Sequence, residues 1–488
     1  MSEHTLPRRQ LIKAGLAGGI GMMVQPTFSW AKPQGNRSGD QPPLLFTFCA
    51  NGGASIIDAF LPIRRETANS HLNAYEDSMI DSIDASPIRC VKNIPYSIQL
   101  PVGPDLTMKN FLQRHYRDML VLTQQGTSVN HLIAAQRSLN GNGINQGRTL
   151  AEAHAVQYGK HFLLPNINMA IAGYVEGGND NSLPIDARQE VVGDASLFAF
   201  STHGYLGLQE AVDDNVILAA RKVRDRLEKN DSSPFWFKDS NTVRTFLQMR
   251  EQMTELEAAN LFELLLLIDR ARLGMKSPHR LPENENLTRI LEVFPDVFTN
   301  PFHAKIALSY LLARYGISGT MTLSMSENIL FNDEEPPTRI VNLPLGFDWS
   351  HTDHRGAQNA MWRSLLQGID GLIRLLQSDS GHGRQDGPSL WDRSLVYIAT
   401  EFGRTRRLEN GSGHDLNNGN LLISPLLKGN QVLGGANAEN LATYGFDPLT
   451  GAPQPQASLD EGDVYSLICQ ALQIEFPKRR SFPIAVRS

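Results

Sequence analysis

The sequence predicts an α/β protein with a mostly parallel β-sheet that is covered by helices on both faces. Short apolar runs recur along the chain and end in small or polar residues, which is typical of buried strands. Helical apolar periodicity lies between several of these runs. Alternating helices and buried strands favour a parallel sheet, and ligands bind at the carboxyl ends of its strands. The polar clusters of this sequence follow those ends.

The first residues have the features of a twin-arginine export signal. The Arg8-Arg9 pair is followed by a Gly/Ala-rich apolar stretch that ends near Ala31. We therefore predict a signal peptide over residues 1–31 and a Gly/Pro-rich linker over residues 32–43. Such a signal implies that the Tat translocase exports the folded protein, which is then periplasmic or secreted.

The first predicted strand is the run "LLFTFCA", which leads into Asn51-Gly52-Gly53. The two glycines allow the backbone to approach a ligand closely. Asp58 follows them and is a candidate ligand for a hard cation or zinc. The alternative is a turn in which Asp58 acts only as a cap.

The second predicted strand, within "DMLVLTQQGTS", leads into a helix that Ser128 or Asn130 would cap. Free N–H groups at a helix N-terminus suit an anion such as phosphate or sulfate. His131 lies in the first turn, where a positive charge is disfavoured, so we expect a neutral imidazole. Ser128 is a candidate nucleophile, and His131 is an alternative nucleophile or a metal ligand. A capped helix with one surface histidine is the simpler interpretation.

The middle of the chain, about residues 213–281, is charged and has helical periodicity. It predicts an all-helical insertion. Its run "LFELLLLIDRARL" is too short to cross a membrane.

A third polar cluster is "DWSHTDHRGAQN", which follows the predicted strand "GTMTLSM". It contains Asp348, His351, Asp353 and His354, which are ligand types that zinc, manganese or iron accept. The alternative is a solvated loop, because polar loops are common.

A fourth cluster follows the predicted strand in "SLVYIATEFGRT". A predicted helix with apolar residues from Leu365 to Leu376 comes before this strand. Glu401 closes the strand and is a further candidate metal ligand, and Arg404 would hold an oxyanion or phosphate. His414 and Asp415 follow a Gly-rich turn and complete the predicted ligand set. A solvated loop with salt bridges is again the alternative.

Composition excludes some classes of function. The net charge is −6, whereas nucleic-acid binders show a basic excess, so we expect no nucleic-acid partner. Cys49, Cys90 and Cys469 lie far apart, which indicates neither a zinc ribbon nor a disulfide framework. Cys469 belongs to an apolar pattern and is predicted to be a core residue, while one disulfide among the three remains open.

These clusters resemble the Tat-exported domain of unknown function 1501 family, within the alkaline phosphatase/sulfatase-like superfamily. The resemblance runs from about Leu44 to the C-terminus and is carried by "FCANGGASIIDAF", "VNHLIAAQRSLNG", "GFDWSHTDH", "VYIATEFGRTRRLENGSGHD" and "GDVYSLICQALQI". It implies a mixed, largely parallel central sheet sandwiched by helices over residues 44–488. It also implies cations held by Asp and His residues, with Asp58 as the first-strand ligand.

The sequence departs from the family pattern at several positions. Ile56 stands where the family often has His, Phe402 stands where the superfamily has His, and Leu416 follows Asp415 where an Asp-His pair is expected. The leading hypothesis is an exported hydrolase of phosphate or sulfate esters, small-molecule or glycan, that uses zinc, manganese, iron or calcium. The alternatives are a non-catalytic protein that binds an envelope partner and a transferase that moves a group such as phosphoethanolamine onto glycans.

Overall fold

The computed structural model describes residues 41–68, 71–96, 106–202, 214–228, 261–267, 286–325, 328–331, 339–342, 346–379, 387–407 and 409–487. The predicted export signal and most of the predicted linker lie outside these ranges. The unit described below belongs to the segment Gln41–Ser488.

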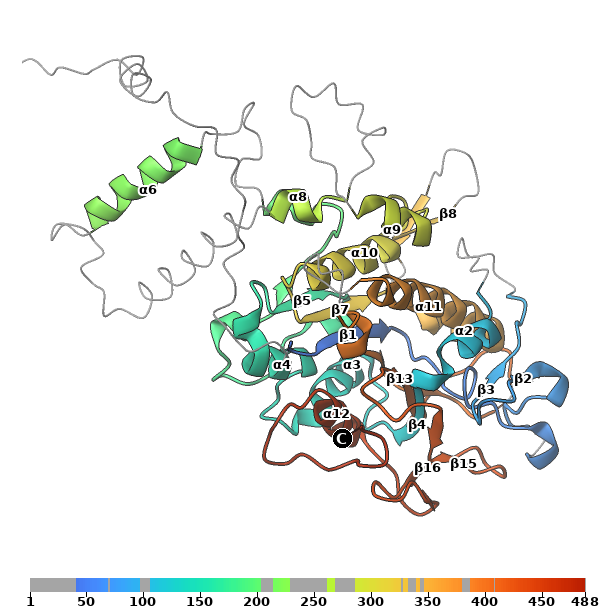
Figure 1. Cartoon of the computed structure of the whole chain (residues 1–488). Coiled ribbons are helices and arrows are strands. Elements are labelled where there is room, and N and C mark those ends of the chain that lie inside the picture. Colours follow the sequence, from blue (N-terminus) through green and yellow to red (C-terminus); the bar gives the residue numbers. More distant parts are fainter. Residues whose placement is uncertain are drawn as a thin grey trace, which may run out of the picture. The chain divides into compact units, whose positions relative to one another are not determined.

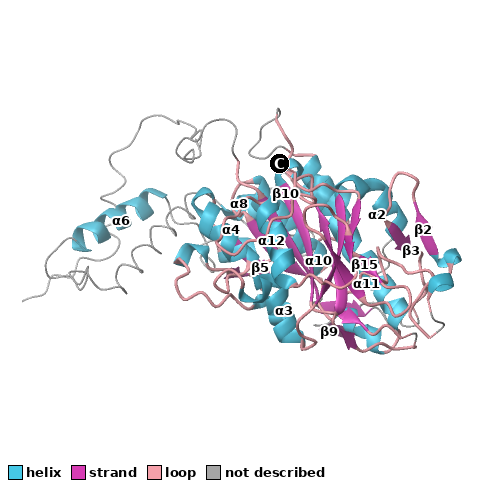
Figure 2. Ribbon diagram, turned by 90° about the horizontal axis from the view of Figure 1, so that it is seen from below, coloured by secondary structure: helices cyan, strands magenta, loops and turns pink. Residues whose placement is uncertain are grey.

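An eight-stranded sheet forms the centre of this unit (Figure 2). Its strands, in spatial order, are β14 (Gln431–Leu433), β4 (Met119–Gln125), β13 (Asn417–Ile423), β10 (Ser394–Thr400), β1 (Leu44–Ala50), β7 (Thr320–Ser324), β5 (Asn166–Met169) and β6 (Glu190–Val191). Within this sheet all strands run parallel except β13, which pairs antiparallel with both β10 and β4. The predicted fold class, a mixed and largely parallel sheet among helices, is confirmed.

Helices cover both faces of the sheet (Figure 1). The described α-helices are α2 (Met108–His115), α3 (His131–Asn140), α4 (Leu150–Tyr158), α5 (Phe198–Ser201), α6 (Asp214–Glu228), α8 (Leu261–Leu265), α9 (Leu287–Val293), α10 (Pro301–Arg314), α11 (His354–Gln377) and α12 (Glu461–Ala471). Helices α2, α10 and α11 pack on one face, and α3, α4 and α12 pack on the other.

Strand β1 contributes side chains to the hydrophobic cores on both faces of the sheet. Its side chains alternate between faces, so Phe46 and Phe48 join the core beneath α10 and α11, while Leu45 and Cys49 join the core beneath α12. The ring of Phe48 meets that of Phe302 in α10 at a centroid distance of 6.1 Å. Every residue of β1 is buried, which accounts for its continuous apolar sequence.

The predicted strands and the predicted helix before the last of them are found in the structure. The four apolar runs became β1, β4, β7 and β10, and the periodic segment became α11, in which Leu365, Ile369, Leu372 and Leu376 are fully buried. β13 was not predicted, because its first residues, 417–420, are polar or glycine and lack the apolar run that marks a buried strand.

In the part of the chain that the structure describes, four smaller β-structures lie outside the central sheet. They are β2 (Ile80–Ser82) with β3 (Arg89–Val91), β8 (Asn328–Phe331) with β9 (Arg339–Asn342), β11 (Gly403–Arg404) with β12 (His414–Asp415), and β15 (Gly435–Ala436), β16 (Thr443–Phe446) and β17 (Pro453–Gln454). The β11–β12 pair matters most for the site, because it places Arg404 opposite His414.

Two further expectations concern helices and cysteines. Of the predicted insertion over residues 213–281, the described parts are α6 and residues 261–267, which include α8, and the remainder lies outside the described residues. Among described residues, no helix has the length and apolarity needed to cross a membrane. All three cysteines are buried and unpaired, so the open disulfide is not formed.

A buried histidine makes the stability of this fold depend on pH. His154 in α4 is fully buried, and its Nε2 lies 2.8 Å from the carbonyl oxygen of Pro43, just before β1. Burial lowers the pKa of His154 to about 4, from an ordinary value of 6.5. Between these two values the unfolded chain binds the proton that the folded chain excludes, so stability falls as pH falls through this window.

We expect the free energy of unfolding to decrease by roughly 2 kcal/mol between about pH 7 and pH 5 through His154 alone. Urea unfolding of the wild type and of His154→Gln at both pH values measures this contribution. The variant is expected to lose that part of the pH dependence, whereas the exposed His71→Gln serves as the matched control. Parallel pH profiles for wild type and His154→Gln would contradict the assignment.

Candidate metal centre

Residues from three of the four polar clusters come together at the carboxyl edge of the sheet. β4 ends at Gln125 and leads to His131 at the start of α3, and β10 ends at Thr400 and leads directly to Glu401. Asp348 and His351 lie in a 3-10 helix, η9 (Gly346–His351), just before α11. Because strands of this sheet end at one edge, segments more than two hundred residues apart contribute to one site.

Three histidines surround one carboxylate oxygen. The Oδ1 atom of Asp348 lies 3.0 Å from Nε2 of His351, 3.6 Å from Nε2 of His414 and 3.9 Å from Nε2 of His131. The Nε2 atoms of His351 and His414 are 3.1 Å apart. His131, Asp348 and His414 each offer one ligand atom, all within 4.8 Å of one another. We call these three residues with His351 the metal centre.

Two of the histidines are held so that Nε2 is the atom left for a ligand. Nδ1 of His131 lies 2.6 Å from Oε2 of Glu401, and Nδ1 of His414 lies 3.0 Å from the carbonyl oxygen of Val129. An acceptor at Nδ1 keeps the proton there and directs the Nε2 lone pair inward. Histidines that bind metals in proteins are almost always held in this way.

The charges at the metal centre differ from one histidine to the next. The hydrogen bond to Glu401 raises the pKa of His131, and burial raises the pKa of the Glu401 carboxyl. Burial lowers the pKa of His414, which favours its neutral ring. The hydrogen bond to Glu401 therefore opposes the effect of the helix end, which by itself favours a neutral His131.

Arg404, which the sequence predicts to hold an oxyanion or phosphate, has its guanidinium engaged within the fold. Its guanidinium is buried and donates to the carbonyl oxygens of Gly52, Gly53, Phe347 and Ser412. It also donates to Oδ1 of Asp348 at 3.0 Å. Arg404 therefore joins three loops and orients Asp348.

Two glycines allow these loops to approach one another. Gly52 has a φ of +90°, and a Cβ atom there would lie 2.3 Å from the backbone nitrogen of Asp348. A Cβ atom on Gly411 would lie 2.1 Å from the carbonyl oxygen of His351. Any side chain at either position would push the Asp348–His351 segment away.

Asp58 and His354 form a separate buried cluster instead of joining the metal centre. Oδ2 of Asp58 lies 3.1 Å from Nε2 of His354, and Oδ1 accepts hydrogen bonds from Asn73 and Tyr75. Burial alone would raise the pKa of Asp58, but His354 and the hydrogen bonds from His354, Ser55 and Tyr75 lower it overall. This cluster anchors the start of α11 to the turn after β1.

The remaining predicted residues serve the local fold. Asp353 caps α11 and accepts a hydrogen bond from Gly356 N at 3.1 Å. Asp415 accepts one from Asn417 N at 2.9 Å and lies 3.4 Å from Arg406. The Oγ atom of Ser128 accepts from Asn130 N at 3.1 Å, while Asn130 is the residue that caps α3.

Sequence reasoning missed two contributors to the metal centre. The ring of Phe402 stacks on His414 at a centroid distance of 4.0 Å and meets His131 edge-on at 4.9 Å. The backbone carbonyl of Val129 holds His414. The aromatic position next to Glu401 was visible in the sequence, but a backbone carbonyl carries no sequence signal.

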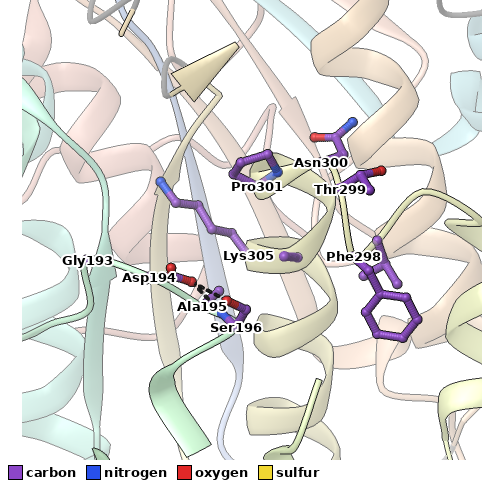
Figure 3. A pocket seen from close by; sticks show the side chains of 11 residues that line it. Gly193, Asp194, Ala195, Ser196, Phe298, Thr299, Asn300, Pro301 and Lys305 are labelled. Atoms are coloured by element: carbon purple, nitrogen blue, oxygen red, sulfur yellow. Dashed lines mark hydrogen bonds between the residues drawn. The ribbon is translucent and has the colours of Figure 1, made fainter. Parts of the chain in front are cut away.

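A small cavity of about 160 Å³ lies between the loop after β6 and the start of α10 (Figure 3). Asp194, Ser196 and Lys305 supply polar groups to its wall. Asp194 accepts hydrogen bonds from Ser196, and the ammonium group of Lys305 donates to the carbonyl oxygen of Met169 at 2.5 Å. These groups are engaged in the fold, so the metal centre remains the better candidate site.

No family model matches this chain, and no curated protein matches it either. Two crystal structures are similar: Ps i-CgsB in complex with k-i-k-neocarrahexaose (8% identity, 91% of this chain and 75% of that chain covered, TM-score 0.31) and Ps i-CgsB alone (7%, 90%, 73% and 0.30). At these values the similarity carries no conclusion about function.

We expect Glu401→Gln to weaken zinc binding by about 10- to 100-fold. The variant lacks the carboxylate that holds the His131 ring and raises the basicity of its Nε2 atom. Competition with a chromophoric chelator measures the affinity. Asp415→Asn, which also removes a carboxylate near His414, is the matched control and is expected to bind zinc as the wild type does. Equal affinities for all three proteins would contradict the role given to Glu401.

We expect Arg404→Lys to lower the free energy of unfolding by about 3 kcal/mol, because lysine keeps the charge but leaves several buried carbonyl oxygens without a donor. Urea denaturation measures the loss. The exposed Arg407→Lys is the control and is expected to change stability little. A change of less than about 0.5 kcal/mol at Arg404 would contradict its role as the joint between loops.

Proposed function

We propose that this chain is a metal-dependent hydrolase of phosphate or sulfate esters that is exported to the periplasm or secreted. The observation that carries the proposal is the convergence of three imidazole nitrogens on Oδ1 of Asp348, with Nδ1 of His131 and His414 already held by acceptors. A set of two or three histidines with one carboxylate suits zinc, manganese or iron better than calcium.

The residues present fit a divalent cation. Their side chains are between 21% and 44% exposed, so an ion and a substrate can reach them from solvent. A bound cation would supply Lewis-acid stabilisation of charge on the ester oxygens and would lower the pKa of a water. The chain's own residues do the rest: Glu401 and Val129 orient the rings, and Arg404 holds Asp348 in place.

In the hydrolysis that we propose, a water oxygen forms a bond to phosphorus or sulfur. The bond from that atom to the leaving-group oxygen breaks, and the leaving oxygen takes up the proton that the water loses. The half-exposed centre admits water from solvent, and the negative charge of Asp348 favours the cation that stabilises the transition state.

One observation favours a second function, that of a non-catalytic envelope protein that binds a partner. Asp58 and His354 are buried in their own cluster, and Asp353 and Asp415 are engaged in local caps and turns. The resemblance implies two cations, whereas the described residues bring one ligand group together. A protein that keeps one cation for structure alone would show metal content without ester hydrolysis.

We expect the exported, mature protein, purified without chelators, to contain about one equivalent of a divalent metal. Plasma mass spectrometry of the wild type and of Asp348→Ala/His414→Ala measures this, and the double variant is expected to be metal-free. The control is His71→Ala/Asp186→Ala, which removes one histidine and one aspartate at exposed positions outside the metal centre. It is expected to keep the metal.

The metal-loaded wild type is then assayed with 4-nitrophenyl phosphate, bis(4-nitrophenyl) phosphate and 4-nitrophenyl sulfate. Hydrolysis of at least one ester, lost in Asp348→Ala/His414→Ala, supports the hydrolase. Background rates for all three esters with zinc, manganese and iron would sink it and would favour the binding protein.

A further inference from the structure

The amide side chain of Gln358 is fully buried and contacts the segment that carries Asp348 and His351. Gln358 belongs to the polar stretch "DWSHTDHRGAQN" and lies in the second turn of α11. A buried amide is unfavourable unless its donors and its acceptor are paired. The partners of this amide therefore indicate its role.

The oxygen and the nitrogen of the Gln358 amide both have partners. Oε1 accepts a hydrogen bond from Ser55 N at 2.9 Å. Nε2 donates to the carbonyl oxygen of Gly53 at 3.0 Å and to Oγ of Ser350 at 2.9 Å. A backbone donor on one side and a backbone acceptor on the other define the orientation of the amide. Gln358 therefore joins the turn after β1 to η9.

Ser350 connects Gln358 to the metal centre. It is fully buried and lies in η9, directly before His351 and two residues after Asp348. Its carbonyl oxygen accepts a hydrogen bond from Ser412 N at 2.8 Å, in the loop before β12. A short 3-10 helix has poor internal hydrogen-bond geometry, so its position depends on outside contacts such as these two.

A second connection runs through the carbonyl oxygen of Gly53. This oxygen accepts from Nε2 of Gln358 and also from Nε of Arg404, at 3.3 Å. Arg404 donates in turn to Oδ1 of Asp348 at 3.0 Å. Hydrogen bonds that share groups in this way depend on one another. Loss of the Gln358 amide therefore also changes the support of Asp348.

Asn359, the next residue of α11, is a second buried amide with different partners. Its side chain is 1% exposed, Oδ1 accepts from Ile94 N at 3.1 Å, and Nδ2 donates to the carbonyl oxygen of Lys92 at 2.9 Å. These partners follow β3 and belong to none of the segments that supply the metal centre. The two neighbouring amides thus bind the backbone in the same manner but at different places.

We propose that Gln358 is a positioning residue of the metal centre, which sets the place of Asp348 and His351 through Ser350 and Gly53. The inference rests on the metal centre of the proposed function, but not on the reaction carried out there. Metal ligands must lie within about 0.2 Å of their preferred distances, so a shift of η9 weakens binding. Loss of a buried amide elsewhere lowers stability alone.

The test compares Gln358→Met with Asn359→Leu, each of which replaces a buried amide by an apolar group of similar size. Competition with a chromophoric chelator measures zinc affinity, and urea denaturation measures stability. We expect both variants to be less stable than the wild type, and Gln358→Met alone to bind zinc about tenfold more weakly. Unchanged affinity in Gln358→Met, or an equal loss in Asn359→Leu, overturns the positioning role.

Ser350→Ala tests the connection through the hydroxyl group and gives an answer even if Gln358→Met does not fold. It is expected to bind zinc more weakly than the wild type. Gln358→Met/Ser350→Ala is expected to bind zinc no more weakly than Gln358→Met, because the two changes break the same contact. Wild-type affinity in Ser350→Ala, or losses that add in the double variant, contradict this connection.

NMR of the metal-free protein separates this inference from the proposed function. The Nε2 atoms of His351 and His414 are 3.1 Å apart, so their ¹⁵N shifts report the geometry of the centre. We expect these shifts to change in Gln358→Met and to stay the same in Asn359→Leu. If the wild type binds no zinc but the shifts follow this pattern, the metal centre fails and the positioning role stands. Unchanged shifts in Gln358→Met, with no zinc bound, overturn both.

Discussion

The candidate site depends on the hydrogen bonds of one buried guanidinium. Arg404 donates to carbonyl oxygens in the turn after β1, in η9 and in the loop before β12, and it donates to the carboxylate of Asp348. A planar group with five donors can satisfy such a set at once, which an ammonium cannot do. Without it, three loops that meet through glycines would carry buried carbonyl oxygens without partners.

Two histidine–aspartate clusters near this edge of the sheet differ in how deeply they are buried. Asp58 and His354 are almost fully buried and bind one another along with Asn73 and Tyr75. Nδ1 of His354 has no hydrogen-bond partner among the described residues, and the contact between Asp58 and His354 fixes the start of α11. Asp348, in contrast, is partly exposed, so its carboxylate can be reached by a ligand while Arg404 donates to it.

Neighbouring groups fix the ring orientations of His131 and His414 at the metal centre. Glu401 and the carbonyl of Val129 set their Nδ1 atoms, and the ring of Phe402 lies against both His131 and His414. The ring of Phe402 is almost fully buried, while the side chains of the metal centre are partly exposed. Partial burial strengthens the electrostatic interactions between these side chains, while solvent still reaches them.

The sequence by itself determined the layers of this fold. Continuous apolar runs become buried parallel strands and the periodic segment becomes α11, because both patterns express burial directly. It also indicated that His131 and Asp348 come after strands and that His414 follows a Gly-rich turn. Only the tertiary structure decided which polar residues meet, since contacts such as those of Arg404, Asp58 and Val129 join segments far apart in the chain. Residue type alone cannot tell a ligand from a cap or a structural joint, because the same side-chain atoms serve all three.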